Sequence, residues 1–215
     1  MYAKFSTLLN RKLVICGLTG SSLLLSSSPA LAHHPFGDKA PANVFEGFLS
    51  GLGHPVIGLD HLAFVIAVGF VAVVFQRGLL IPISFVVASL VGTIVHLLNV
   101  DLPAPEFFIS ASVLLFGLLL ALKNSLPSGV VIALAAVAGL FHGYAYGEAV
   151  VGSEMFPLLA YLVGFTTIQM AIAIGVYLTV ERMGGSREQQ TMNLRFAGFT
   201  LAGIGVAFLS GVVLN

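Results

Sequence analysis

Residues 56–78 read VIGLDHLAFVIAVGFVAVVFQRG, and this stretch decides the fold class. Positions 56–75 supply the run of about 20 mostly apolar residues that a helix needs to cross a bilayer, and Arg77-Gly78 ends it. Asp60 and His61 are its only polar side chains. Polar groups inside a membrane are costly and usually serve a function. The stretch therefore predicts a membrane span with a functional pair near its start.

The whole chain has the same character. Hydrophobic residues make up 58% of it and charged residues only 8%, whereas a soluble domain carries about 25% charged residues. A chain of this composition cannot cover a water-facing surface, which excludes a soluble enzyme. The basic residues form no run that would hold phosphates, and the net charge is zero, so we expect no nucleic-acid partner. The expected surroundings are a lipid bilayer.

Hydropathy divides the chain into several membrane spans. Six are predicted, at 56–75, 78–98, 105–122, 128–147, 156–180 and 193–213. A shorter apolar piece, Val44 to Gly53, is expected to form a helical turn or two at the outer surface before Pro55 breaks it. The predicted fold class is an all-α integral membrane protein, a six-transmembrane-helix bundle that follows a cleaved signal peptide.

The signal peptide is predicted at residues 1–32. A basic start is followed by a short apolar core at 13–25 and by an Ala-x-Ala pattern that ends at Ala32, as in secretory signals. An uncleaved first span is the alternative, but a core of about 13 residues is short of the length needed to cross. Residues 33–215 then form a single permease domain.

Cleavage after Ala32 would place His33 and His34 at the new amino terminus. A free amine, a backbone nitrogen and the second imidazole can together chelate nickel or copper. A chance histidine pair in a flexible tail is the alternative.

The distribution of charge predicts the orientation. A signal peptide puts the mature N-terminus on the outer side of the cell (inner) membrane, and six spans then put most basic residues inside, in agreement with the positive-inside rule. Those on the inside are Arg77, Lys123, Arg182, Arg187 and Arg195. All six histidines and seven of the nine acidic residues fall on the outer half. This predicts an outer vestibule that collects cations.

The first candidate site is His54-Pro55-Val56-Ile57-Gly58-Leu59-Asp60-His61. Pro55 and Gly58 are expected to break the helix, which lets His54 fold back toward His61. Imidazole and carboxylate are ligands that nickel, cobalt, zinc and iron(II) prefer. Two other roles for Asp60 stay open: it orients His61 from behind the ligands, or it caps a helix dipole.

The second candidate site is Phe141-His142-Gly143-Tyr144-Ala145-Tyr146-Gly147-Glu148. An ionisable residue at the depth of His142 is functional by default, whereas Glu148 near the interface is either a ligand or a solvated surface carboxylate. Glycines recur every fourth residue from Gly139 and predict close helix packing. His96, late in the second span, is either a structural histidine or a further ligand.

With these motifs, the chain resembles the HupE/UreJ family of hydrogenase- and urease-accessory permeases, over the signal peptide and all six spans. The second motif has one residue fewer between Gly147 and Glu148 than the family pattern. The resemblance implies import of nickel or cobalt. The functional positions that it implies are His54, Asp60, His61, His142 and Glu148. Family members commonly have further histidines where this chain has Tyr144 and Tyr146, so a weaker or harder ion site is expected.

The function expected from the sequence is transmembrane import of a divalent transition-metal cation, nickel or cobalt, to supply metalloenzyme maturation. The protein is then not an enzyme, and the maturation proteins of metalloenzymes are candidate partners. The metal-ligand candidates are His54, Asp60, His61, His142, Glu148, His96, His33 and His34. Two alternatives stay open: an intramembrane metal-dependent hydrolase, and a non-transporting metallocentre assembly factor.

Overall fold

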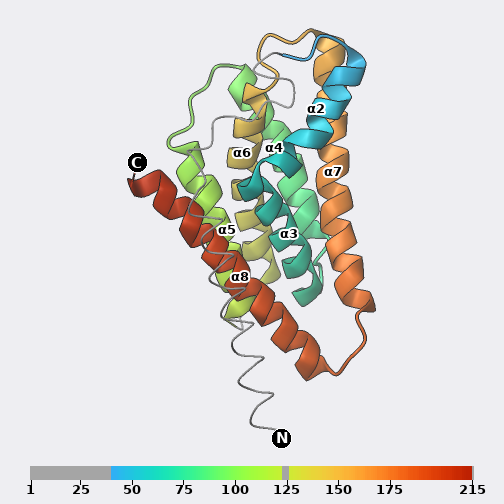
Figure 1. Ribbon diagram of the computed structural model, residues 1–215, viewed down its shortest axis with the longest axis vertical. Coiled ribbons are helices and arrows are strands. Elements are labelled where there is room, and N and C mark those ends of the chain that lie inside the picture. The colour runs from blue at the N-terminus through green and yellow to red at the C-terminus, as the bar shows by residue number, and fades with distance from the viewer. Residues whose placement is uncertain (1–39, 123–125, 215) are drawn as a thin grey trace, which may run out of the picture. The chain divides into compact units, whose positions relative to one another are not determined.

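The computed structural model describes residues 40–122 and 126–214, which form seven α-helices and no strand. The helices are α2 (Val44–Ile57), α3 (Leu59–Val74), α4 (Leu80–Leu97), α5 (Pro105–Ala121), α6 (Ser128–Glu148), α7 (Met155–Arg182) and α8 (Arg187–Leu214) (Figure 1). The all-α prediction is confirmed for this part of the chain. The predicted signal peptide, His33 and His34 lie outside the described residues.

Four helices, α4, α6, α7 and α8, are long and apolar enough to cross a membrane. Helices α2 and α3 pass the same test together as one bent pair, which raises the number of candidate spans to five. Helix α5 is apolar but has only 17 residues. The chain is thus a helical bundle with several candidate membrane spans, and a sixth span through α5 stays a prediction.

The prediction for the region around Pro55 is wrong in one respect. Helix α2 runs through Pro55 to Ile57, and the break lies at Gly58, where α3 turns away by 80°. Proline removes one backbone hydrogen bond, but tertiary packing outweighs this loss. A Cβ atom at Gly47 or Gly51 would overlap the backbone of α7, so the two helices are in direct contact. Packing against α7 thus holds α2 as a helix of 14 residues.

Helix α3 occupies the middle of the bundle (Figure 1). Its side chains Phe64, Val65 and Val68 are fully buried and belong to one apolar core with residues of α4, α5, α6, α7 and α8. Because α3 packs against these helices, His61 near its start is held inside the protein, whereas Asp60 beside it is only half-buried.

The helices around α3 are joined in pairs through glycines. A Cβ atom at Gly143 of α6 would overlap the Ser89 carbonyl of α4, and one at Gly117 of α5 would overlap the backbone of α8. The prediction that the glycines of α6 pack closely is confirmed, and α2 with α7 forms the third such pair. Without side chains in between, the backbones approach closely, as in membrane helix pairs.

The helix directions separate the polar residues into two ends. We call the end where α3 begins and α6 finishes the histidine end, since it contains His54, His61 and His142. The opposite end, here the arginine end, contains the turn after α3 and the connection from α7 to α8 at the bottom of Figure 1. Arg77, Arg182, Arg187 and Arg195 lie at the arginine end. This separation agrees with the charge asymmetry predicted from the sequence.

Candidate metal-ion site

The bend between α2 and α3 brings His54 and His61 together. Gly58 has extended backbone angles (φ −71°, ψ 101°), so the last turn of α2 and the first turn of α3 meet at a sharp angle. The two imidazole rings meet edge to face with their centroids 6.2 Å apart. The expectation that His54 folds back toward His61 is confirmed, with Gly58 rather than Pro55 making the break.

Glycine is required at position 58 because His61 lies over it. A Cβ atom there would come 2.7 Å from Cδ2 of His61 and 3.4 Å from a carboxylate oxygen of Asp60. The absence of a side chain thus makes room for the His61 ring, while the backbone angles themselves would suit most residues.

His61 makes its closest side-chain contact with His142 of α6. The two Nδ1 atoms are 2.8 Å apart, and both rings are buried, that of His142 completely. Phe64 and Phe85 pack against His142 with centroid distances of 4.6 and 5.5 Å. The two histidines are thus enclosed by aromatic side chains, where an unpaired polar atom would be costly.

A serine of α5 completes the surroundings of His142. The Ser112 hydroxyl lies 3.0 Å from Nε2 of His142 and donates a hydrogen bond of 2.6 Å to the backbone carbonyl of Ile109. Both ring nitrogens of His142 therefore have partners.

Two tyrosines hold His54 and His61 from the other side. The Tyr161 hydroxyl of α7 lies 2.9 Å from Nδ1 of His54 and donates to the backbone carbonyl of Tyr146, also at 2.9 Å. The Tyr146 ring packs on His61 and His54 with centroid distances of 4.5 and 5.2 Å. Its hydroxyl is buried without a hydrogen-bond partner in the described part of the chain. We call these six residues, His54, His61, Ser112, His142, Tyr146 and Tyr161, the histidine cluster.

The acidic candidates are placed differently from the histidines. Asp60 is half-buried, and its carboxylate accepts a hydrogen bond of 2.8 Å from the backbone N–H of His61. Gly58 is the N-cap residue of α3 and no side chain in the described part of the chain caps this end, so Asp60, in the first turn, is placed to interact with the helix dipole rather than to cap the helix. Glu148, the last residue of α6, is exposed to solvent. Among the described residues, neither carboxylate forms a hydrogen bond with a side chain of the histidine cluster, as His142 does.

His96 lies apart from the cluster. It packs against Tyr144 with a centroid distance of 4.6 Å and covers Gly147, and its buried Nδ1 has no hydrogen-bond partner among the described residues. Within residues 40–122 and 126–214, no three His, Cys, Asp or Glu side chains are arranged to hold one metal ion. An ion at the histidine cluster would need other ligands, such as hydroxyl oxygens, backbone oxygens or retained water.

Sequence reasoning missed Ser112 and Tyr161 as parts of the site. Both are buried hydroxyl-bearing residues in largely apolar helices, and each of these helices carries other polar residues as well. The only sign of them in the sequence was a hydroxyl group in an apolar span. Such hydroxyls commonly just hydrogen-bond to the backbone of their own helix, so the pattern does not indicate a site.

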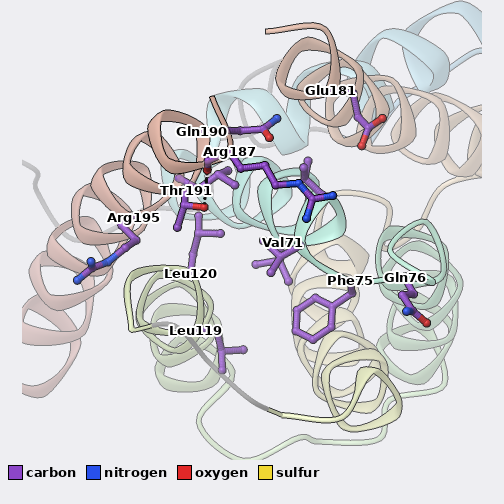
Figure 2. A pocket seen from close by; sticks show the side chains of 13 residues that line it. Val71, Phe75, Gln76, Leu119, Leu120, Glu181, Arg187, Gln190, Thr191 and Arg195 are labelled. Carbon is purple, nitrogen blue, oxygen red and sulfur yellow. Dashed lines mark hydrogen bonds between the residues drawn. The ribbon is translucent and has the colours of Figure 1, made fainter. Parts of the chain in front are cut away.

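A second polar region lies at the arginine end. A cavity of about 750 Å³ is lined by the ends of α3, α5 and α7 and by the first turns of α8. Val71, Phe75 and Leu120 form its apolar part, and Arg187 and Glu181 bring charge to it. Figure 2 shows the Arg187 side chain extending across the hollow toward the side where Glu181 lies. Fully buried core residues of α3, among them Val65 and Val68, separate this cavity from the histidine cluster.

Known proteins resemble the chain over nearly its whole length. The sequence profile of the HupE/UreJ proteins matches residues 21–208. Protein HupE of Rhizobium leguminosarum bv. viciae is 29% identical over 194 residues, which cover 89% of this chain and 96% of that protein. No solved structure matches significantly. Because the profile covers both histidine motifs and all seven helices to within a few residues of the end of α8, the chain belongs to the HupE/UreJ family.

Proposed function

We propose that this protein imports a divalent transition-metal ion, nickel first and cobalt second, across the cell membrane. The observation that carries the proposal is the contact of His61 with His142, 2.8 Å apart inside an apolar bundle. Imidazole is a preferred ligand of nickel and cobalt, and buried polar residues inside membrane bundles typically mark ion pathways. The HupE/UreJ family is associated with nickel and cobalt uptake for hydrogenase and urease, which supports the choice of ions.

The orientation proposed places the histidine end outside and the arginine end inside, as the positive-inside rule requires. An ion would be captured at the outer side and would lose part of its water shell against His54 and His61. Asp60 beside them would add negative charge that attracts a cation. Release would follow through the cavity at the arginine end, toward the side where metalloenzymes are assembled.

Passage requires a rearrangement of the helices. Val65 and Val68 are fully buried between the histidine cluster and the arginine-end cavity, so the conformation described here is closed at this level. The arrangement thus suits a carrier that opens to one side at a time better than an open pore. The ligand set of few carboxylates favours moderate affinity, which transport needs because a tightly bound ion is not released.

Uptake into proteoliposomes tests the proposal. Purified protein is reconstituted into vesicles that contain a metal-sensitive chelating dye, and nickel, cobalt, zinc, copper, manganese and iron(II) are added outside in turn. We expect saturable entry of nickel, slower entry of cobalt and no entry into protein-free vesicles. A protein that transports none of the ions, yet keeps about one metal ion through mild chelation, would contradict import and indicate an enzymatic metal centre.

Gly58→Ala is expected to impair uptake without unfolding the bundle. The new Cβ atom would come 2.7 Å from Cδ2 of His61, and the imidazole must move away because the backbone behind it is fixed. We expect nickel uptake to fall about tenfold or more, as when the surroundings of metal ligands are disturbed. Gly175→Ala is the matched control, since none of the described atoms lies within 4 Å of the added Cβ. Normal uptake by Gly58→Ala would show that the position of the His61 ring is unimportant.

A further inference from the structure

The hydrogen-bond directions at Ser112 determine which nitrogen of His61 carries hydrogen. A hydroxyl has one hydrogen to donate, and that of Ser112 is used on the carbonyl of Ile109 at 2.6 Å. Ser112 must therefore accept the bond from Nε2 of His142, so Nε2 of His142 carries its hydrogen. Nδ1 of a neutral His142 is then an acceptor, and Nδ1 of His61, 2.8 Å away, must be the donor. The lone pair of His61 is left on Nε2.

The same reasoning applies to His54 through Tyr161. The Tyr161 hydroxyl donates its one hydrogen to the backbone carbonyl of Tyr146. It must therefore accept from Nδ1 of His54, at 2.9 Å. His54 is then the tautomer with hydrogen on Nδ1 and a lone pair on Nε2, which is also the tautomer of His61.

Two independent hydrogen-bond chains thus lead to the same result. One starts at the Ile109 carbonyl and passes through Ser112 and His142 to His61, and the other starts at the Tyr146 carbonyl and passes through Tyr161 to His54. Their starting points are backbone carbonyls, which can only accept, so the direction of each chain is fixed. The rings at the two ends are neighbours, with centroids 6.2 Å apart.

We propose that Ser112 and Tyr161 are positioning residues that hold His61 and His54 in the same tautomer, so that both present the Nε2 lone pair to the transported ion. This inference rests on the proposed function in taking the ion as the ligand. It also gives His142 a role different from that of a ligand: both of its ring nitrogens are engaged, by Ser112 and by His61. Ser112 fixes the tautomer of His142, and His142 in turn fixes the tautomer of His61. Residues that hydrogen-bond to histidine ligands in metal sites act in the same way.

Nitrogen-15 NMR of histidine-labelled, metal-free protein in detergent reads the tautomers directly. In the wild type we expect hydrogen on Nδ1 of His54 and His61 and on Nε2 of His142. Ser112→Ala should mix the tautomers of His61 and His142 and leave His54 unchanged, whereas Tyr161→Phe should affect His54 alone. Ser112→Thr keeps a hydroxyl and should keep the wild-type pattern. Hydrogen on Nε2 of His61 in the wild type, or an unchanged pattern in Ser112→Ala, would overturn the proposal.

Nickel titration of the same purified full-length proteins measures the consequence for binding. We expect Ser112→Ala and Tyr161→Phe to weaken nickel binding about tenfold, the lower part of the range for residues that orient histidine ligands. Ser89→Ala is the matched control: Ser89 is also buried and donates to the Phe85 carbonyl, but makes no bond to a histidine within the described part of the chain. Equal weakening in Ser89→Ala would reveal a merely structural effect and overturn the proposal. Because this titration needs no transport, a failure of import in vesicles would reject the proposed function separately.

Discussion

A His61→Asn variant is expected to take up no more nickel than protein-free vesicles, although its bundle remains folded. The asparagine amide reaches the place of Nδ1 and can still donate to His142, whose Nδ1 lies 2.8 Å from that of His61. What the substitution removes is Nε2, the nitrogen that faces away from His142. His61→Ala should be equally inactive but less stable, because it leaves a buried nitrogen of His142 unpaired at a cost of about 1–3 kcal/mol. Dye-loaded proteoliposomes and melting curves in detergent measure the two effects.

His96→Ala is the matched control for the loss of a histidine. His96 lies apart from the histidine cluster, against Tyr144 and Gly147. We expect the His96 variant to retain most nickel uptake. Loss of all nickel uptake in His96→Ala would indicate that the ion site lies nearer α4. Full nickel uptake by His61→Asn would show that His61 is not part of the ion pathway.

The helices themselves were predictable because their signal is local. Lipid-facing segments must be apolar over the whole bilayer thickness, and the predicted spans at 78–98, 128–147 and 193–213 correspond to α4, α6 and α8. The glycine spacing of α6 also predicted close helix packing correctly, since residues four apart lie on the same face of a helix. At Pro55 a local rule failed, because contacts with α7 hold α2 together beyond it.

The site was predictable only in part. The spacing along the sequence predicted that His54 and His61 lie close together, since the two residues flank a single bend. That His142 meets His61 through Nδ1, and that Ser112 supports it, depends on how α3, α5 and α6 are placed around one another. No spacing along the chain encodes that placement. Asp60, expected among the ligands, accepts a bond from the backbone N–H of His61, and its role as a ligand stays a prediction.

Gly143→Ala is expected to destabilise the protein strongly, since it separates α4 from α6. The added Cβ atom would overlap the carbonyl group of Ser89, and the Thr93 hydroxyl donates a hydrogen bond of 2.8 Å to the Gly143 carbonyl at the same contact. Backbone atoms cannot rotate away as a flexible side chain can, so the helices themselves must shift. We expect a loss of about 3 kcal/mol or more, at the upper end of overpacking effects, visible as a lower melting temperature in detergent.

Gly129→Ala makes the same chemical change on the same helix with the opposite expectation. No atom of the described residues lies within 4 Å of a Cβ atom at Gly129, and alanine favours helix over glycine by up to about 1 kcal/mol. The melting temperature should therefore stay constant or rise slightly. If both variants melt alike, the close approach of α4 and α6 is not what holds His142 in place. If only Gly143→Ala melts early, the α4–α6 contact carries the stability, and His142, the residue before Gly143, is held at His61 by that contact.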